Sequence, residues 1–401
     1  MDRPRRFRPR LDHGELRVLV TVGLSISTVE SIRPTASYRA LEFGAGAGEI
    51  GIIAGAYATL ALFAAVPLGR AVDRFGERWF LTAGSSLLIV GAVIGLAIPR
   101  LWALVLMQAT VGLGHISVAV SAQTLSGNTE NSRELRFARL SVATAAGHLV
   151  GPLVAGTIID GERSFPVVQG TGGALTVAAA FGAIAVCLAA TSRSTPGVGP
   201  VGTTEARSKV GIRSLLTISG MPQAVYVGIA ALTTMDLLVA YLPAVGEERG
   251  IRPSVIGYLL ATRAVMTIAS RLVMGYLLDR LGRRRLLLAA LVVAAATVVS
   301  LAVPLPVWSL FLVMSVAGFA LGVLFPLTSA WVANRAPARA RGTALAIRLT
   351  GNRLSQVIVP VGLGALAATF GVGVIFIAAG AGLFAGSAMV QRAPLGQDGA
   401  D

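Results

Sequence analysis

Two acidic residues stand inside long apolar stretches, at positions that the chain repeats. Glu30 and Asp236 are 206 positions apart (236 − 30), and each lies in the first apolar stretch of its half of the sequence. A charge near the centre of a bilayer costs at least about 2.5 kcal/mol, so an ionisable residue kept there usually has a function. Such a carboxylate could carry a proton or bind a cationic molecule. The alternative for Glu30 is a structural ion pair with Arg33, three residues on and on the same helical face.

Further polar residues interrupt other apolar stretches. Arg263 has no acidic residue three or four positions away, so we expect it to face a cavity or a carboxylate on another helix. Asp236, on the preceding stretch, is its natural partner, and such a pair could open when a substrate or a proton binds. Arg263 and Arg353 could instead recognise an anionic substrate. Gln108 could hydrogen-bond a substrate or a neighbouring helix, and the lone His115 and His148 are interpreted as hydrogen-bonded structural residues.

The composition indicates that these residues are positioned by membrane-spanning helices. Of 401 residues, 54% are hydrophobic and 13% are charged, whereas soluble domains carry about 25% charged residues. A soluble enzyme and a disordered chain are therefore excluded, and the single Cys187 excludes an intrachain disulfide. A helix needs about 20 apolar residues to cross the hydrocarbon core. The twelve expected spans are Leu16–Ala36, Ile50–Gly69, Phe80–Ala97, Leu101–Ala122, Val142–Ile159, Ala174–Ala190, Pro222–Leu242, Val255–Tyr276, Leu286–Val303, Val307–Trp331, Leu345–Thr369 and Val372–Val390.

The basic residues predict the orientation of these spans. The net charge of +15 could suggest nucleic acid, but the arginines cluster in short segments between apolar runs, as in positive-inside loops. With the N-terminus in the cytoplasm, most arginines fall on the cytoplasmic side. We therefore expect a multi-pass protein of the inner (plasma) membrane with both termini cytoplasmic. The only lysine, Lys209, follows no glycine-rich loop, so a Walker A nucleotide site is absent.

The two halves of the chain are repeats. The stretch Thr191–Ser214 is rich in Gly, Pro, Ser and Thr and reads as a flexible linker. We predict an N-terminal six-helix bundle at 1–192, a cytoplasmic linker at 193–213 and a C-terminal bundle at 214–401. Pro152 and Gly156 recur as Pro360 and Gly364 at a shift of 208. At a shift of 206, Gly69, Asp73, Arg74, Gly76 and Arg78 recur as Gly275, Asp279, Arg280, Gly282 and Arg284.

The last set forms two loops with the spacing G-x-x-x-D-R-x-G-x-R, GRAVDRFGER and GYLLDRLGRR. This doubled pattern resembles the signature loop of the major facilitator superfamily. We expect Asp73 to accept hydrogen bonds from arginines of a neighbouring helix. These bonds should hold one conformation closed and break in the other. Gly69 should let two helices approach closely, and Gly76 should permit a sharp turn. The resemblance implies an all-α membrane protein with twelve transmembrane helices in two pseudo-symmetric six-helix bundles around a central cavity.

A second motif lies in the fifth span. Gly147, Gly151, Pro152 and Gly156 resemble the antiporter motif of the superfamily, with alanine in place of one glycine. Small residues four apart form a groove for a neighbouring helix, and the proline bends its own helix. This resemblance favours export over import. Gln108 stands where the family often has an arginine associated with proton movement, so that arginine's role is not carried over.

Taken together, these patterns predict a secondary active transporter and not an enzyme. We expect it to move a small molecule by alternating access, as a proton-coupled exporter in which Glu30 or Asp236 carries the proton. The first alternative is a proton-coupled importer of an anionic metabolite held by Arg263 and Arg353. The second is a non-transporting membrane sensor on the same fold. The expected partners are a small-molecule substrate, protons and membrane lipid; we expect a monomer with no nucleic acid, cofactor or metal.

Overall fold

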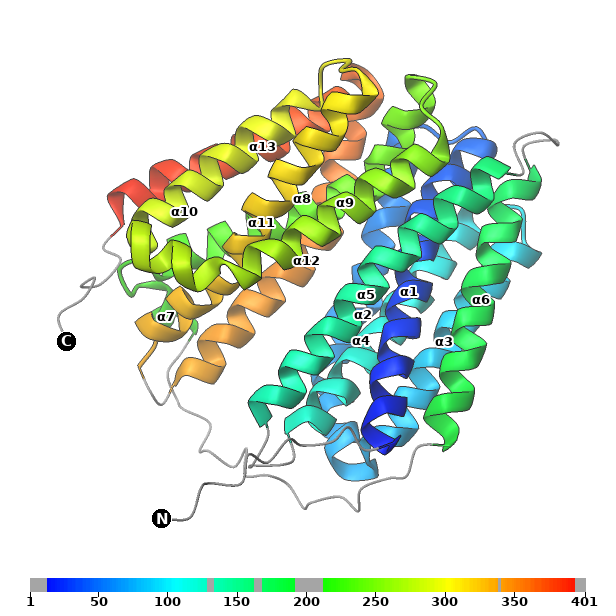
Figure 1. Ribbon diagram of the computed structural model, residues 1–401, viewed down its shortest axis with the longest axis horizontal. Helices are drawn as coiled ribbons and strands as arrows, with labels where there is room; N and C mark the ends of the chain where they lie inside the picture. The colour runs from blue at the N-terminus through cyan, green and yellow to red at the C-terminus, as the bar shows by residue number, and fades with distance from the viewer. Residues whose placement is uncertain (1–12, 128–132, 162–167, 192–211, 338–339, 394–401) are drawn as a thin grey trace, which may run out of the picture.

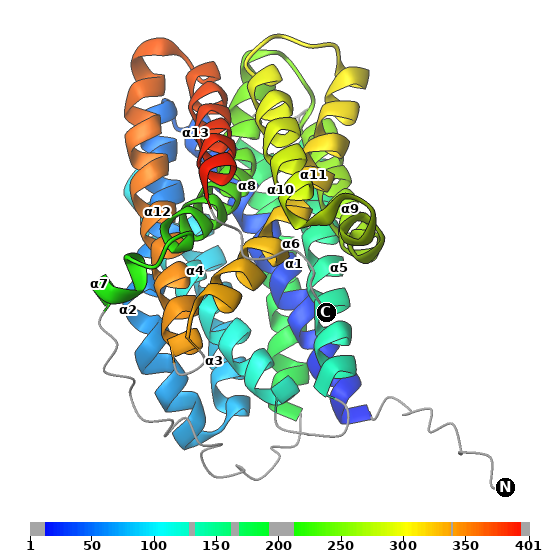
Figure 2. The ribbon, with the colours of Figure 1, turned by 90° about the vertical axis from the view of Figure 1, so that its left-hand side faces the viewer.

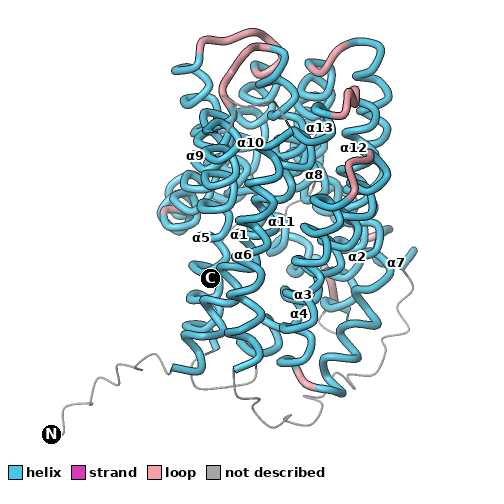
Figure 3. Tube along the Cα trace, turned by 90° about the vertical axis from the view of Figure 1, so that its right-hand side faces the viewer, coloured by secondary structure: helices cyan, strands magenta, loops and turns pink. Residues whose placement is uncertain are grey.

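The computed structural model describes residues 13–127, 133–161, 168–191, 212–337 and 340–393, and in these ranges the regular elements are all helices (Figure 1). Twelve of the helices have 20 to 30 residues, and one short helix accompanies them. Figure 3 shows how little of the described chain lies outside helices. The predicted all-α fold with twelve long helices is therefore confirmed.

The first half of the chain supplies six of the long helices. They are α1 (His13–Glu42), α2 (Ala47–Phe75), α3 (Glu77–Ala97), α4 (Leu101–Gly127), α5 (Arg133–Gly161) and α6 (Val168–Thr191). The predicted linker at 193–213 falls almost wholly on residues 192–211, which lie outside the described ranges. The domain boundaries therefore stay predictions.

The second half begins with a single short turn of helix. The helices in order are α7 (Ile212–Leu216), α8 (Met221–Glu248), α9 (Pro253–Leu272), α10 (Met274–Ser300), α11 (Val307–Arg335), α12 (Arg341–Phe370) and α13 (Gly373–Arg392). Among the described residues, ten helices are long and apolar enough to cross a membrane by length and composition alone. The polar and charged residues of α1 and the arginine-rich start of α10 keep those two helices out of that set. The chain is a multi-pass membrane protein.

The long helices pack as two groups, α1–α6 and α8–α13, that meet along two seams. One seam joins α2 to α12 and the other joins α5 to α9, as the quarter-turned view of Figure 2 also shows. Glycines allow both close approaches. A Cβ added to Gly51 would lie 2.3 Å from the Pro360 carbonyl oxygen, and one added to Gly257 would lie 2.5 Å from that of Pro152. The small residues at these seams therefore set the distance between the two groups.

The two groups are held together at the end of the helices where α1 turns into α2 and α8 turns into α9, here called the outer end after the orientation predicted from the basic residues. Ser37 donates a hydrogen bond to the Ala240 carbonyl at 2.7 Å, and Ser254 donates one to Asp160 at 2.6 Å. Both bonds join the first group to the second. Toward the opposite, inner end, where α1 begins and α13 ends, the ribbons of the two groups diverge (Figure 1). The structure is thus closed at its outer end.

The two signature loops adopt the same backbone conformation at the inner end. Gly76 has φ 88° and ψ 148°, and Gly282 has φ 70° and ψ 161°, a region that only glycine enters readily. After each turn an arginine caps the last helix of its own group: Arg78 donates to the Ala190 carbonyl in α6, and Arg284 to the Gln391 carbonyl in α13. Cations are favoured at these helix ends. The repeat in the sequence is therefore a repeat in space.

The expectation that Gly69 lets two helices approach closely was wrong for this structure. A Cβ added to Gly69 or Gly275 would meet nothing within 4 Å, so neither glycine serves a close helix contact here. The reason is that no neighbouring helix lies against them at the inner end. Asp279 is exposed and, among the described residues, makes no hydrogen bond or ion pair. The side chain of Asp73 lies outside what the structure describes, while Arg74 lies over the ring of its neighbour Phe75.

Candidate functional site

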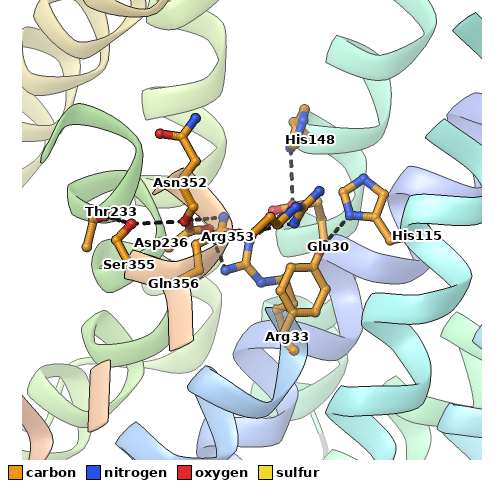
Figure 4. Close-up of polar contacts among 11 residues, drawn as sticks. Glu30, Arg33, His115, His148, Thr233, Asp236, Asn352, Arg353, Ser355 and Gln356 are labelled. Carbon is orange, nitrogen blue, oxygen red and sulfur yellow. Dashed lines mark hydrogen bonds and ion pairs between the residues drawn. The ribbon is translucent and has the colours of Figure 1, made fainter. Parts of the chain in front are cut away.

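An ion pair joins the two groups of helices midway between their ends. Arg33 of α1 lies 2.6 Å from Asp236 of α8, measured from Nη2 to Oδ1, and both side chains are largely buried (Figure 4). Arg33 also lies 3.7 Å from Glu30, one turn earlier on α1, and its guanidinium stands 4.5 Å from the ring centre of Tyr57. One arginine therefore serves both of the carboxylates that the sequence singles out.

The expected pairing of Asp236 with Arg263 was wrong. Both oxygens of Asp236 are occupied, one by Arg33 and the other by the amide of Gln356 in α12, which donates to it at 2.6 Å. Arg33, and not Arg263, pairs with Asp236 because α1 packs directly against α8. This packing brings the Arg33 guanidinium across the boundary between the groups. Asp236 is thus fixed from both groups at once.

Arg353 joins the same network through an amide rather than a carboxylate. Its Nη1 donates to the Gln356 side-chain oxygen at 3.1 Å, so Gln356 links Arg353 to Asp236. One turn of α12 also carries Ser355, whose hydroxyl lies 2.8 Å from that of Thr233 in α8. This side of α12 is polar because it faces α8 and the centre of the protein, not lipid.

Glu30 is the most buried acid of the cluster and has a different neighbour. Nδ1 of His148, on α5, lies 3.3 Å from Glu30 Oε1. The glycines of the fifth-span motif bring α5 this close to α1: a Cβ added to Gly151 would lie 2.6 Å from the Glu30 Cβ. Ser31 fastens the same contact by donating to the Gly151 carbonyl at 2.9 Å. Gly147 packs likewise against Ile26, so the motif positions His148 beside the acid.

The later part of that motif serves the seam between the groups. A Cβ added to Gly156 would lie 2.5 Å from the carbonyl oxygen of Pro253, at the start of α9. The Pro152 carbonyl faces Gly257 in the same way. Pro152 lies inside α5, where it removes one backbone hydrogen bond. The motif therefore contacts both the acid-bearing helix α1 and the opposite group.

A second polar pair lies beside the ion pair. The hydroxyl of Tyr57 in α2 hydrogen-bonds Nδ1 of His115 in α4, and the two rings stack with centres 5.9 Å apart. Tyr57 is the repeat equivalent of Arg263, at the 206-residue shift (263 − 57). Each packs its backbone against a glycine of the fourth helix of its group, Gly112 for Tyr57 and Gly318 for Arg263. The same place in the fold thus holds a neutral ring in one group and a cation in the other.

Several buried polar atoms at this depth lack partners. Arg263 is buried, and among the described residues it makes no hydrogen bond or ion pair; its Nε is sealed from solvent without an acceptor. Gln108 has an unpartnered side-chain oxygen, and Asn352 has neither of its side-chain atoms bonded. Unsatisfied buried groups are rare and expensive. Within the described residues, no group of three His, Cys, Asp or Glu could hold a metal ion.

The structure therefore unites some of the predicted residues and separates others. It brings Glu30, Asp236 and Arg353 into one network, leaves Arg263 and Gln108 outside it, and places the signature loops at the inner end. Sequence reasoning missed Gln356, read Arg33 only as a local partner of Glu30, and took His148 for a structural residue. One signal was available: the shift of 208 that maps Pro152 to Pro360 also maps His148 to Gln356.

Comparison with known proteins decides the family. Residues 18–245 and 224–395 match the family model of the Major Facilitator Superfamily. Together these two ranges cover nearly the whole chain. The chain belongs to the major facilitator superfamily. The paired loops at residues 69–78 and 275–284 lie inside the two matched ranges.

Solved structures of superfamily transporters share this fold. A crystal structure of the nucleoside transporter NupG aligns with a TM-score of 0.73 at 13% identity, covering 95% of this chain and 99% of that one. A bacterial homologue of the human lysosomal transporter Spinster, in an inward-facing and occupied conformation, aligns with a TM-score of 0.73 at 15% identity, over 94% and 96% of the two chains. At these identities the similarity concerns the fold alone.

A curated relative matches a shorter part of the sequence. The inner membrane transport protein YajR of Escherichia coli is 28% identical over 115 residues. That match covers 28% of this chain and 25% of the relative. The chain thus aligns with only about a quarter of the length of this relative.

Proposed function

We propose that this member of the superfamily is a secondary active transporter that moves a small molecule by alternating access. The observation that carries the proposal is the ion pair between Arg33 and Asp236, which crosses the boundary between the two groups at mid-depth. In parallel-repeat transporters the two halves rock around a site near the midplane. The contacts of a charge network across that boundary change whenever the two halves move. A ligand that binds this network in one conformation more tightly than in the other therefore shifts the balance between the conformations.

Proton coupling follows from the two carboxylates around one arginine. With both acids ionised, Arg33 is attracted to Asp236 at 2.6 Å and to Glu30 at 3.7 Å. Protonating one acid removes its attraction for Arg33 and leaves Arg33 to the other acid, which changes the link between the groups. We propose that this exchange couples proton movement to transport. The resemblance of the Gly147–Gly156 segment to the antiporter motif supports export as the direction.

A second candidate is supported by the surplus of cations. The cluster and its neighbour Arg263 hold three arginines against two carboxylates, counting Arg33 and Arg353 with Arg263. Arg263 has no acidic partner among the described residues, and a buried cation without one attracts an anion. Import of an anionic metabolite, with Arg263 and Arg353 as its ligands, is therefore the alternative.

Proton flux in everted membrane vesicles tests the proposal. Vesicles holding an acid-inside gradient receive a panel of cationic, neutral and anionic compounds, and a pH-sensitive dye follows the gradient. The variants are Glu30→Gln and Asp236→Asn, with Glu248→Gln as the matched control, since Glu248 is an exposed carboxylate at the outer end.

Each outcome selects one function. If a cationic or neutral compound dissipates the gradient in wild type and in the control but not in Glu30→Gln or Asp236→Asn, proton-coupled export stands. If only an anionic compound moves, inward and dependent on Arg263, the importer replaces it. Binding of a compound without any flux in either orientation would show a sensor, and would contradict the proposal.

A further inference from the structure

The two acids of the cluster have equivalent partners of different chemistry. Glu30 and Asp236 are related by the shift of 206, and their neighbours on the fifth helix of each group, His148 and Gln356, by the shift of 208. An amide neither takes up nor releases a proton, whereas an imidazole can do both. The two halves thus build one arrangement twice, and only the first copy pairs its acid with a group that exchanges protons.

The two acids also differ in how firmly they are held. Asp236 accepts hydrogen bonds at 2.6 Å from both Arg33 and Gln356. Glu30 has longer contacts, 3.7 Å to Arg33 and 3.3 Å to His148. Arginine stays protonated in proteins, so neither partner of Asp236 passes a proton to it. Of the two acids, Glu30 has the longer contacts and Asp236 the shorter ones.

His148 is the more exposed member of this pair. The Glu30 side chain is only 4% exposed, whereas that of His148 is 38% exposed. The titratable and charged groups that the neighbouring helices present around Glu30 and His148 are Arg33 on α1, His115 on α4 and Arg263 on α9. Among its described residues, α6 carries no ionisable side chain except Cys187. Of the side chains that form an ion-pair contact with Glu30, that of His148 is the most exposed.

We propose that His148 is a proton relay between water and Glu30, and that Asp236 serves as the fixed counter-ion of Arg33. This inference rests on the proposed proton coupling and assigns it to one of the two acids. In this proposal the first helix group takes up and releases the proton. The second group responds through Asp236, which is bound to Arg33 of the first group.

The transfer balances as follows. With Glu30 ionised, the Nδ1–H of neutral His148 donates to Oε1. A proton from water binds at Nε2, and the Nδ1–H bond then breaks as its proton forms an O–H bond on Glu30. The products are a neutral carboxylic acid and a neutral imidazole that carries its proton on Nε2. One proton has moved from water to Glu30, and the reverse sequence releases it.

The test follows proton uptake by the purified full-length protein in detergent after a rapid pH jump, using an indicator dye. Glu30→Gln identifies the proton that belongs to Glu30. His148→Gln should fold, because glutamine already occupies the equivalent place against Asp236. His148→Ala is measured with and without added imidazole. His13→Gln is the matched control, since His13 lies exposed at the inner end of α1.

The relay predicts a change of rate and not of proton number. Glu30→Gln should take up one proton fewer than wild type. His148→Gln should still take up the Glu30 proton and lack only the proton of the histidine itself. Its uptake should be at least about tenfold slower than that of wild type. Imidazole should restore the rate in His148→Ala and leave His148→Gln and the control unchanged. A rescue of this kind needs an imidazole that transfers protons, so a merely structural histidine would not produce it.

Three results would count against the relay. If His148→Gln takes up the Glu30 proton at the wild-type rate, the relay is wrong while proton coupling at Glu30 stands. If His148→Ala is slow but imidazole does not restore it, His148 only supports the fold of the site. If Glu30→Gln takes up as many protons as wild type, Glu30 does not bind the proton and the proposed coupling at this acid fails with the relay.

Discussion

Arg33 and Asp236 join the two repeats of the chain through an ion pair of 2.6 Å, although they come from helices 203 residues apart in sequence. The pair sits at mid-depth, while the hydrogen bonds of Ser37 and Ser254 close the outer end above it. It therefore lies farther from the outer end than either of these two bonds. Because both side chains are largely buried, each is the main compensation for the other's charge.

Replacing Asp236 by Asn should destabilise the protein. It leaves the guanidinium of Arg33 buried with only the more distant Glu30 as a counter-ion, and breaking a buried pair on one side costs about 3 kcal/mol or more. The thermal unfolding midpoint in detergent should fall by several degrees, while Glu248→Gln should leave it unchanged. An unchanged midpoint in Asp236→Asn would mean that the pair carries no net stability.

Replacing Arg263 by Met should have the opposite sign. Arg263 is buried with an unpartnered Nε, so an apolar side chain of similar length removes a desolvation cost without breaking an ion pair. We expect the unfolding midpoint to rise, by the equivalent of about 1 kcal/mol or more. If Arg263→Met lowers the midpoint as Asp236→Asn does, Arg263 has an acidic partner after all.

Replacing Gly156 by Ala should strain the seam between α5 and α9. The new methyl group would lie 2.5 Å from the Pro253 carbonyl oxygen, and such overpacking costs about 1–3 kcal/mol. Gly362→Ala is the matched control, because its methyl group meets nothing within 4 Å. Both variants gain the same helix propensity, so the difference between their unfolding midpoints isolates the contact. Equal midpoints would mean that the seam yields freely.

Replacing Tyr241 by Phe should loosen the closed outer end. The Tyr241 hydroxyl donates toward the carbonyls of Pro360 at 3.0 Å and Ala47 at 3.3 Å, which ties α8 to both helices of the other seam. One such bond contributes about 0.5–1.5 kcal/mol, enough to raise the population with separated outer ends by about two- to tenfold.

Spin labels measure that change directly. Ile52→Cys on α2 and Leu366→Cys on α12 are exposed and lie on facing helices near the outer end. In a Cys187→Ser background they report the distance between the groups. Tyr241→Phe should increase the long-distance fraction, and an unaltered distance distribution would show that the hydroxyl does not hold this end closed.

The sequence predicted the architecture because the features that set it are periodic. Twelve apolar stretches, a doubled loop motif and constant shifts of 206 and 208 leave little freedom for another fold. The glycine turns at Gly76 and Gly282 follow from the same motif, since their backbone angles exclude other residues. The role of Gly69 did not follow, because a close helix contact depends on which end of the protein is closed.

The candidate site could be predicted only in part. Glu30 and Asp236 stood out by charge and symmetry, but which cation each acid contacts depends on how α1, α5, α8 and α12 pack. Arg33 was read as a local partner of Glu30, three residues away, whereas its shortest contact crosses to Asp236. His148 gave no signal alone, and it gains meaning only beside Gln356, its repeat equivalent.

The central claim is that a proton on Glu30 drives transport through the mid-depth cluster, and reconstituted vesicles test it most directly. For a transported compound found in the vesicle panel, two fluxes are compared in wild type and Glu30→Gln: net flux driven by a pH gradient, and exchange of labelled for unlabelled compound at equal pH. Exchange needs the substrate and the rocking motion but no proton step. The account predicts that Glu30→Gln keeps exchange within about twofold and loses at least about tenfold of the driven flux, a difference of about 1.4 kcal/mol or more. A Glu30→Gln protein that still moves the compound along the pH gradient at the wild-type rate would contradict it.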